Sequence, residues 1–135
     1  ATSTVPAGVV DIFPTLTEIM QVPDLRQVPL DGISLLPLID GQMKERSRPL
    51  GFWQARGGKD RTIDSGPSAW RDNRYKLVKT GPGNFELYDL TADPAEQANL
   101  ASQQPETVDR MKSGMEQWQR SVLQSLQGAD YPESK

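Results

Sequence analysis

The strongest structural signal in the sequence is an apolar stripe near its C-terminal end. Six apolar residues recur at spacings of three and four: Val108, Met111, Met115, Trp118, Val122 and Leu126. This spacing matches one face of an α-helix, and Pro105 and Gly128 suit its two ends. A helix with a single apolar stripe must bury it against another element. The rest of the chain therefore has to supply a complementary face.

Short strands in the preceding part of the chain supply that face. Alternating side chains predict strands at about 49–55, 68–71, 75–79 and 85–88. Asp72-Asn73 and the turn residues 81–84 favour hairpins between the last three strands. We therefore predict a four-stranded antiparallel sheet with the C-terminal amphipathic helix packed across one face.

Two shorter helices are predicted before the sheet. Residues 8–22 carry apolar residues at helical spacing, with Asp11 as N-cap and Pro14 in the first turn. Ser34 caps a second short helix that ends at Gly41. The charged segment 42–48 then separates helical from strand-like periodicity. The predicted class is α+β, with a domain boundary between residues 1–45 and residues 46–135.

Composition excludes several classes of function. A net charge of −3 argues against nucleic-acid binding, which needs a basic face. No apolar run approaches the ~20 residues needed to span a membrane. The chain has no cysteine and no histidine, which excludes a cysteine nucleophile, a thiolate zinc site and an imidazole base within it. Because it begins without Met or a signal-peptide pattern, we expect it to be part of a longer polypeptide.

The candidate binding residues are the cations Arg56, Lys59 and Arg61. They lie on a polar, glycine-rich loop, and Arg71, at the end of the second strand, is expected to lie close by. Loops on rigid scaffolds often carry binding residues, and guanidinium groups hold anionic oxygens in pairs. The alternative is a solvated loop whose charges only maintain solubility.

Acidic residues near the fourth strand are predicted to be structural. Glu86, Asp89, Asp93 and Glu96 lack the central glycine of a calcium loop, and Pro94 interrupts the segment. We expect them to form turns and cap helices.

Aromatic residues offer a second set of candidate ligand contacts. Trp118, Met111 and Met115 are predicted to be core because they lie on the helical stripe. For Trp53 and Trp70, core packing and stacking on a ligand both remain open.

Taken in order, the segments resemble the C-terminal part of a type I sulfatase. The resemblance rests on VDIFPTL at 10–16, DGISLLPLIDG at 31–41, YKLV at 75–78, ELYDLTADPAEQANL at 86–100, and the closing helix with Trp118. These are the formylglycine-dependent sulfatases of the alkaline-phosphatase-like superfamily.

This resemblance implies that the two N-terminal helices end a large α/β catalytic domain whose remainder is missing, and that the sheet and last helix form a smaller subdomain. It implies a parent sulfuric ester hydrolase with formylglycine, calcium and a sulfated substrate, in the periplasm or secreted. Without cysteine or histidine, no catalytic or metal-binding residue carries over. The chain is expected to be structural and inactive alone, with Arg56, Lys59 or Arg61 lining the substrate site.

Two alternatives remain at this point. One is the same region of a phosphodiesterase or phosphonate monoester hydrolase of the superfamily. The other is a freestanding, non-catalytic binding module, which predicts a monomer with a complete core. The sulfatase interpretation instead predicts that Val9, Ile12, Leu16 and residues 35–39 are left exposed or become buried in a homodimer.

Overall fold

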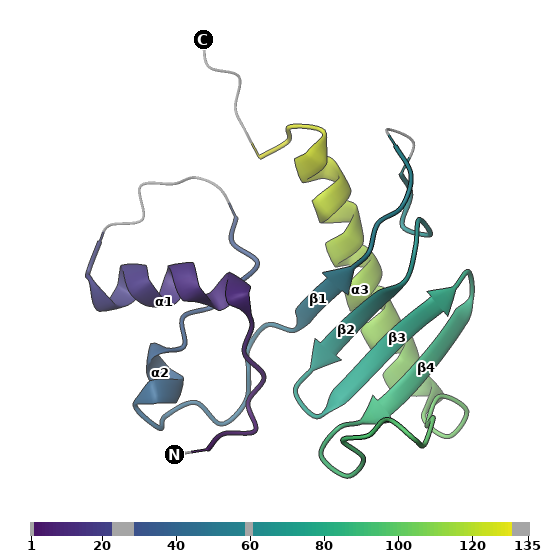
Figure 1. The fold of residues 1–135 in the computed structure, drawn as a ribbon, viewed down its shortest axis with the longest axis horizontal. Coiled ribbons are helices and arrows are strands. Elements are labelled where there is room, and N and C mark those ends of the chain that lie inside the picture. The colour runs from purple at the N-terminus through teal and green to yellow at the C-terminus, as the bar shows by residue number, and fades with distance from the viewer. Residues whose placement is uncertain (1, 23–28, 59–60, 131–135) are drawn as a thin grey trace.

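The structure, a computed structural model, describes residues 2–22, 29–58 and 61–130. Figure 1 shows a four-stranded sheet with a long helix behind it and two short helices to one side. The elements in chain order are the 3-10 helix η1 (Val9–Asp11), α1 (Ile12–Ile19), α2 (Leu36–Ile39), β1 (Leu50–Trp53), β2 (Ser68–Asp72), β3 (Tyr75–Gly81), β4 (Asn84–Asp89) and α3 (Pro105–Leu126). The α+β prediction is confirmed.

The strands pair as an antiparallel meander in the order β1-β2-β3-β4. In the register of the sheet, Gly51 lies opposite Trp70, Trp70 opposite Leu77, and Leu77 opposite Leu87. The turn between β2 and β3 places Asn73 at φ 49°, a left-handed conformation that asparagine tolerates better than most residues. The predicted strands and hairpins are therefore correct, although β1 ends two residues earlier than expected.

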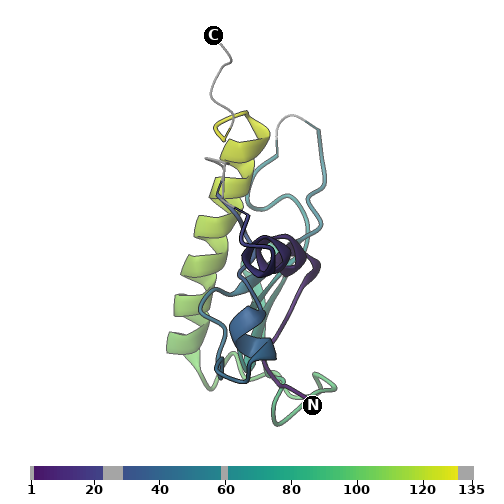
Figure 2. The same ribbon diagram turned by 90° about the vertical axis from the view of Figure 1, so that its left-hand side faces the viewer.

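Helix α3 covers one face of this sheet (Figures 1 and 2). The buried core between them consists of Trp70, Leu77, Leu87, Met111 and Met115. Trp118 packs against the edge of this core at Gly51, where a Cβ atom would lie 2.5 Å from the indole ring. The absence of a side chain at residue 51 therefore lets the helix approach β1 closely.

The buried stripe of α3 differs from the predicted one toward its C-terminal end. Gln119 is fully buried, and the end-of-stripe residue Leu126 is 61% exposed. Figure 1 shows that the last turns of α3 extend beyond the strands of the sheet, so the sheet does not cover this end of the helix. The side chain of Gln119 lies one turn after Met115 and enters the core although it is polar.

The first helical segment is shorter than predicted. It starts as η1 and continues as α1, with Asp11 at the N-cap position of α1 and Pro14 in its first turn. The Asp11 side chain does not cap α1 as expected; it is buried and binds other partners. The second helix is reduced to α2, and Gly41 follows it at φ 73°, as a helix-ending glycine does.

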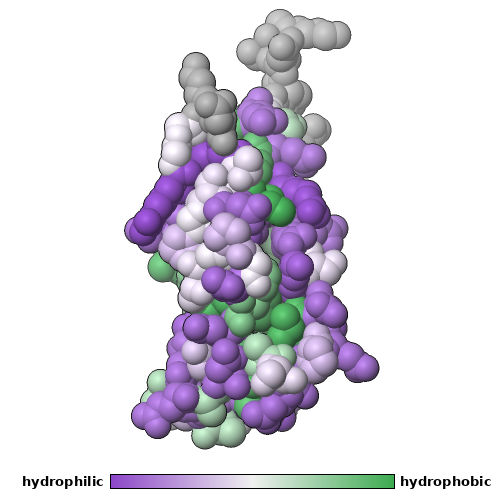
Figure 3. Space-filling model, turned by 90° about the vertical axis from the view of Figure 1, so that its right-hand side faces the viewer, coloured by the Kyte–Doolittle hydropathy of each residue, from purple (hydrophilic) through white to green (hydrophobic). Residues whose placement is uncertain are grey.

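Exposed large apolar side chains gather on the N-terminal segment. They include Val9, Val10, Ile12, Phe13, Leu16, Ile19, Met20 and Val22. The predicted exposure of Val9, Ile12 and Leu16 is confirmed, and Ile39 is exposed in the 35–39 run, whose other residues are half-buried. On the opposite side of the molecule, by contrast, hydrophobic surface forms only a narrow band between hydrophilic flanks (Figure 3).

Of the four acidic residues predicted to form turns or cap helices, Asp89 at the end of β4 and Asp93 form turns. Glu86 lies within β4 and accepts from the Tyr88 hydroxyl, and Glu96 pairs with Lys76, so for these two the prediction is wrong. Asp89 accepts hydrogen bonds from the backbone N–H groups of Thr91 and Ala92, and Asp93 accepts from those of Gln97 and Ala98. Arg74 also pairs with Asp89. The hydrogen bond from Arg74 holds the pKa of the Asp89 carboxyl below the usual range.

Among the helices that the structure describes, none has the length and apolar character to cross a bilayer.

Candidate functional site

The loop between β1 and β2 carries two of the three predicted binding residues on the surface. Arg56 and Arg61 are both exposed. Arg61 donates a 2.9 Å hydrogen bond from Nε to the carbonyl oxygen of Gly57. Lys59 lies outside the described residues. The two arginines thus stand on the same exposed loop, with guanidinium nitrogens available to an anion.

This loop is tied to the sheet at its base. Gln54 N–H donates to the carbonyl of Pro67, and Arg56 N–H donates to the carbonyl of Ser65. Gly66 adopts φ 104°, and a Cβ atom there would lie 2.2 Å from the carbonyl oxygen of Gln54. The crossing of the two loop arms therefore requires glycine at this position.

The buried side chain of Lys79 anchors residues 63 and 64 in the second half of the β1–β2 loop. Lys79 is 3% exposed, and its Nζ donates to the carbonyl of Ile63 and to the carboxylate of Asp64. Because strand β3 carries Lys79, these contacts fix residues 63 and 64 relative to the sheet. The loop arginines consequently extend from a supported base.

A hollow of about 520 Å³ separates this loop from the end of α3. It is lined by Gly58, Arg61, Leu123, Leu126 and Gln127. One cation beside apolar side chains suits an anionic group attached to a carbon skeleton. The hollow also explains part of the exposure of Leu126.

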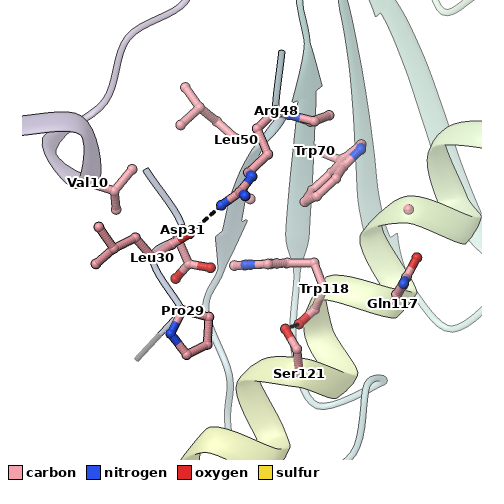
Figure 4. Close-up of a pocket in the computed structure, with 13 residues that line it drawn as sticks. Val10, Pro29, Leu30, Asp31, Arg48, Leu50, Trp70, Gln117, Trp118 and Ser121 are labelled. Carbon is pink, nitrogen blue, oxygen red and sulfur yellow. Dashed lines mark hydrogen bonds between the residues drawn. The ribbon is translucent and has the colours of Figure 1, made fainter. Parts of the chain in front are cut away.

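A second hollow, of about 550 Å³, lies between the N-terminal segment and α3 (Figure 4). The rings of Trp70 and Trp118 meet there at 5.8 Å with a 41° tilt. Arg48 closes one side by donating to the carbonyl oxygen of Leu30. Trp70 is core and Trp118 contacts the core while also lining this hollow. Trp53 is half-buried, and its Nε1 has no partner in the described chain.

Arg71, the fourth predicted cation, does not join the loop arginines. Trp53 pairs with Ser68 next to the loop, whereas Arg71 pairs with Leu50 at the other end of β2. Three residues of strand span roughly 10 Å. The expectation that Arg71 lies close to the loop cations is wrong because β2 runs away from the loop. It lines a different hollow, on the sheet face opposite α3.

Asp11 and Arg46 form a buried ion pair that local sequence patterns did not predict. Both side chains have no solvent exposure. Asp11 also accepts hydrogen bonds from the backbone N–H groups of Gly8 and Ile33. Burial alone would raise the pKa of Asp11, but hydrogen bonds from Arg46, Ile33 and Gly8 outweigh it and leave the pKa lowered. The pair joins the N-terminal segment to the start of the sheet.

Comparison with known proteins places these features in a family context. No protein-family model matches the chain. Arylsulfatase K from Xenopus laevis is 31% identical over 135 residues, which covers 93% of this chain and 22% of the relative. Choline-sulfatase from Rhizobium meliloti (strain 1021) is 31% identical over 107 residues, covering 78% of this chain and 20% of the relative. The chain is thus similar in sequence to one part of these sulfatases.

The fold agrees with that homology. A Bacteroides thetaiotaomicron protein provisionally assigned as a sulfatase superposes with a TM-score of 0.60 and 25% identity, covering 87% of this chain and 25% of that protein. The chain spans about a fifth of the length of the curated relatives it matches. The similarity thus covers most of this chain and a small part of each relative.

The residues of this chain do not fit the formylglycine and calcium that the resemblance to sulfatases implies. The sequence has no cysteine to modify and no histidine to place beside a sulfate group. In the described ranges, no three acidic side chains come together in a group suited to a metal ion. The carboxylate oxygens of Asp89 and Asp93 instead accept hydrogen bonds from backbone N–H groups in turns.

Proposed function

We propose that this chain is the C-terminal part of a sulfatase, an enzyme that hydrolyses sulfuric esters. The chain serves as a structural piece of that enzyme, and its catalytic nucleophile and metal ion are held elsewhere in the same polypeptide. The parent enzyme is of the formylglycine- and calcium-dependent type that the sequence resembles.

One observation carries this proposal. Homology to sulfatases extends over 93% of the chain but only 22% of the relative, while the chain has neither cysteine nor histidine. A chain segment that is similar to sulfatases but lacks the residue types of their catalytic site is best explained as a structural part of the enzyme. The exposed apolar residues of η1 and α1 are consistent with a surface that is covered in the parent.

The proposed division of the chain follows from that view. Residues 1–45 form the end of the catalytic domain, and residues 46–135 form the smaller C-terminal subdomain. The exposed apolar residues of the first part, among them Ile12 and Leu16, would then pack against the rest of the catalytic domain. Burying a large apolar side chain contributes about 1.5–3 kcal/mol, so the surface would gain substantially from being covered.

We further propose that the loop arginines contact the substrate of the parent enzyme. Arg56 and Arg61 are exposed and stand on a loop whose base is fixed by Lys79. Lys59 lies between them in the sequence and belongs to the same proposal. A guanidinium contributes about 1.5–3 kcal/mol through hydrogen bonds to a charged group.

The test uses the full polypeptide that carries this sequence. Sulfate release is measured with 4-nitrophenyl sulfate and with choline sulfate, and a phosphonate monoester is tested at equal concentration. We expect sulfate release to exceed phosphonate hydrolysis. The opposite preference would favour the phosphonate monoester hydrolase alternative, and binding without hydrolysis of any ester would favour the binding module.

The loop arginines are tested in the same protein. Arg56→Ala and Arg61→Ala should each lower kcat/KM by roughly 10- to 100-fold, the equivalent of one lost charged hydrogen bond. Arg120→Ala is the matched control, because Arg120 is an exposed arginine on α3 paired with Glu116. Unchanged kcat/KM in both loop variants would reject the substrate role of the loop.

A further inference from the structure

We propose that the sheet face opposite α3 holds a docking site for a protein segment that presents an acidic side chain between apolar residues, with Arg71 as the group that binds the carboxylate. This site is separate from the loop arginines and does not depend on the reaction that the parent enzyme catalyses.

The site is a hollow of about 650 Å³ on the open face of the sheet. Its lining residues are Pro6, Ala7, Leu50, Phe52, Ala69, Arg71, Lys76, Leu90 and Glu96. Alternation along β1 and β2 directs Gly51 and Trp70 toward α3, so the neighbouring residues Phe52 and Ala69 face the other way. Figure 1 shows α3 behind the sheet, and this face is turned toward the viewer.

The hollow contains one positive charge in excess. Lys76 Nζ lies 2.7 Å from both carboxylate oxygens of Glu96, and Glu96 also attracts Arg71, so two cations share one carboxylate in this hollow. Arg71 donates from Nε to the carbonyl oxygen of Asn73 at 2.7 Å, which fixes the orientation of its guanidinium. In the part of the chain that the structure describes, no hydrogen bond engages its two terminal nitrogens.

This arginine is partly removed from water. Arg71 is half-buried, and desolvation lowers the pKa of its guanidinium. A cation in such a position gains from a carboxylate, which accepts two parallel hydrogen bonds from the terminal nitrogens. The charge and the fixed fork geometry therefore call for a planar, negatively charged group.

The apolar residues that line the hollow favour a negatively charged group that is attached to apolar side chains. Leu50, Ala69 and Leu90 line the hollow, and Phe52 is 55% exposed beside it. A free, hydrated oxyanion would leave this apolar surface in water. An acidic residue with an apolar neighbour on each side would neutralise Arg71 and cover Phe52 at the same time, which favours a protein segment over an inorganic ion.

The experiment titrates the 135-residue chain with a short peptide and records backbone amide shifts by NMR. The probe is acetyl-Leu-Glu-Leu-amide, and the matched control peptide is acetyl-Leu-Gln-Leu-amide. We expect shifts at Phe52, Ala69 and Arg71, with binding of the Glu peptide at least about tenfold tighter, or 1.4 kcal/mol. Sodium sulfate at the same ionic strength should shift these amides little.

Variants assign the preference to one side chain. Arg71→Gln should abolish the preference for the Glu peptide, and Arg120→Gln, an exposed arginine on α3, should leave it intact. If Arg71→Gln does not fold, Arg71→Lys should retain part of the preference and Phe52→Ser should weaken both peptides together. Equal affinity for the two peptides, equal shifts with sulfate, or no binding at millimolar peptide would each overturn the proposal.

Discussion

Asp11 and Arg46 are 35 residues apart in sequence, yet their side chains meet in two hydrogen bonds of 2.7 Å with neither exposed to solvent. Asp11 belongs to the 3-10 helix η1, and Arg46 lies just before β1. The pair therefore connects the N-terminal segment to the sheet through a buried contact. Its removal should have a larger effect than the loss of any surface ion pair of this molecule.

The first prediction concerns this ion pair. Asp11→Asn should destabilise the chain by about 3–5 kcal/mol, because Arg46 would keep its charge in a buried position without a carboxylate. The free energy of unfolding is measured in urea. Combining Asp11→Asn with Arg46→Met should restore part of the loss, and strictly additive effects of the two substitutions would show that the residues are not coupled.

The second prediction is a loss of stability in acid. The folded-state pKa of Asp11 lies below the ordinary aspartate value of 3.8, so its contribution to stability is present above pH 3.8 and disappears as the pH falls through the folded-state pKa. The pKa of Asp89 is also lowered in the folded state, mainly by the hydrogen bond from Arg74, so Asp89 contributes to the same loss of stability in acid. Urea midpoints should drop between about pH 5 and pH 3. Asp11→Asn should show a shallower drop, and a drop identical to that of the parent chain would contradict the role of Asp11.

The third prediction tests the close approach of α3 to β1. Gly51→Ala places a methyl group 2.5 Å from the Trp118 ring, which should cost about 1–3 kcal/mol and displace the indole. The near-ultraviolet circular dichroism of the tryptophans should change together with the free energy of unfolding. Gly58→Ala has open space around it and serves as the control. Equal effects of the two substitutions would mean that Trp118 does not pack on Gly51.

The fourth prediction concerns the polar side chain in the core. Gln119 is fully buried, and neither its Nε2 nor its Oε1 has a partner among the described residues. Gln119→Met should stabilise the chain by about 1 kcal/mol, because an unsatisfied amide is costly to bury. Gln124→Met, at an exposed position of the same helix, should be near neutral. A marked loss of stability in Gln119→Met would instead indicate that a buried water bonds the amide.

The fifth prediction is that the chain associates with itself through η1 and α1. Ile12 and Leu16 are 55% and 48% exposed within a larger apolar surface, and water contact with such a surface is unfavourable. Sedimentation velocity should show concentration-dependent association that Ile12→Glu with Leu16→Glu abolishes. Leu126→Glu, at another exposed position, should not. A monomer at all concentrations would contradict the prediction.

Local patterns in the sequence predicted the elements whose stability is local. The strands and the long helix follow from alternation and from 3.6-residue spacing, and Asn73 and Gly41 mark turns by their own backbone preferences. The exposure of Ile12 and Leu16 was expected from the resemblance to sulfatases, which implies that the partner of their helix lies outside this chain.

Contacts between distant segments could not be predicted in the same way. Arg46 lies in a charged run that resembles a solvated linker, and its burial depends on Asp11 far away in the sequence. Gln119 breaks the apolar stripe by its chemistry and enters the core only because of where α3 crosses the sheet. At the candidate site, the exposure of Arg56 and Arg61 was predictable, whereas the separation of Arg71 depended on the direction of β2.

The contacts of Arg46 also determine where this polypeptide can be cut. Its backbone N–H donates to the side-chain oxygen of Asn73, and the Asn73 amide donates back to the Arg46 carbonyl. A truncated protein that begins at residue 46 would retain these hydrogen bonds to the β2–β3 turn but would lack the carboxylate of Asp11. In such a fragment the guanidinium of Arg46 would lie beside the sheet without its carboxylate partner. A shorter protein expressed for crystallisation should therefore start upstream of Gly8.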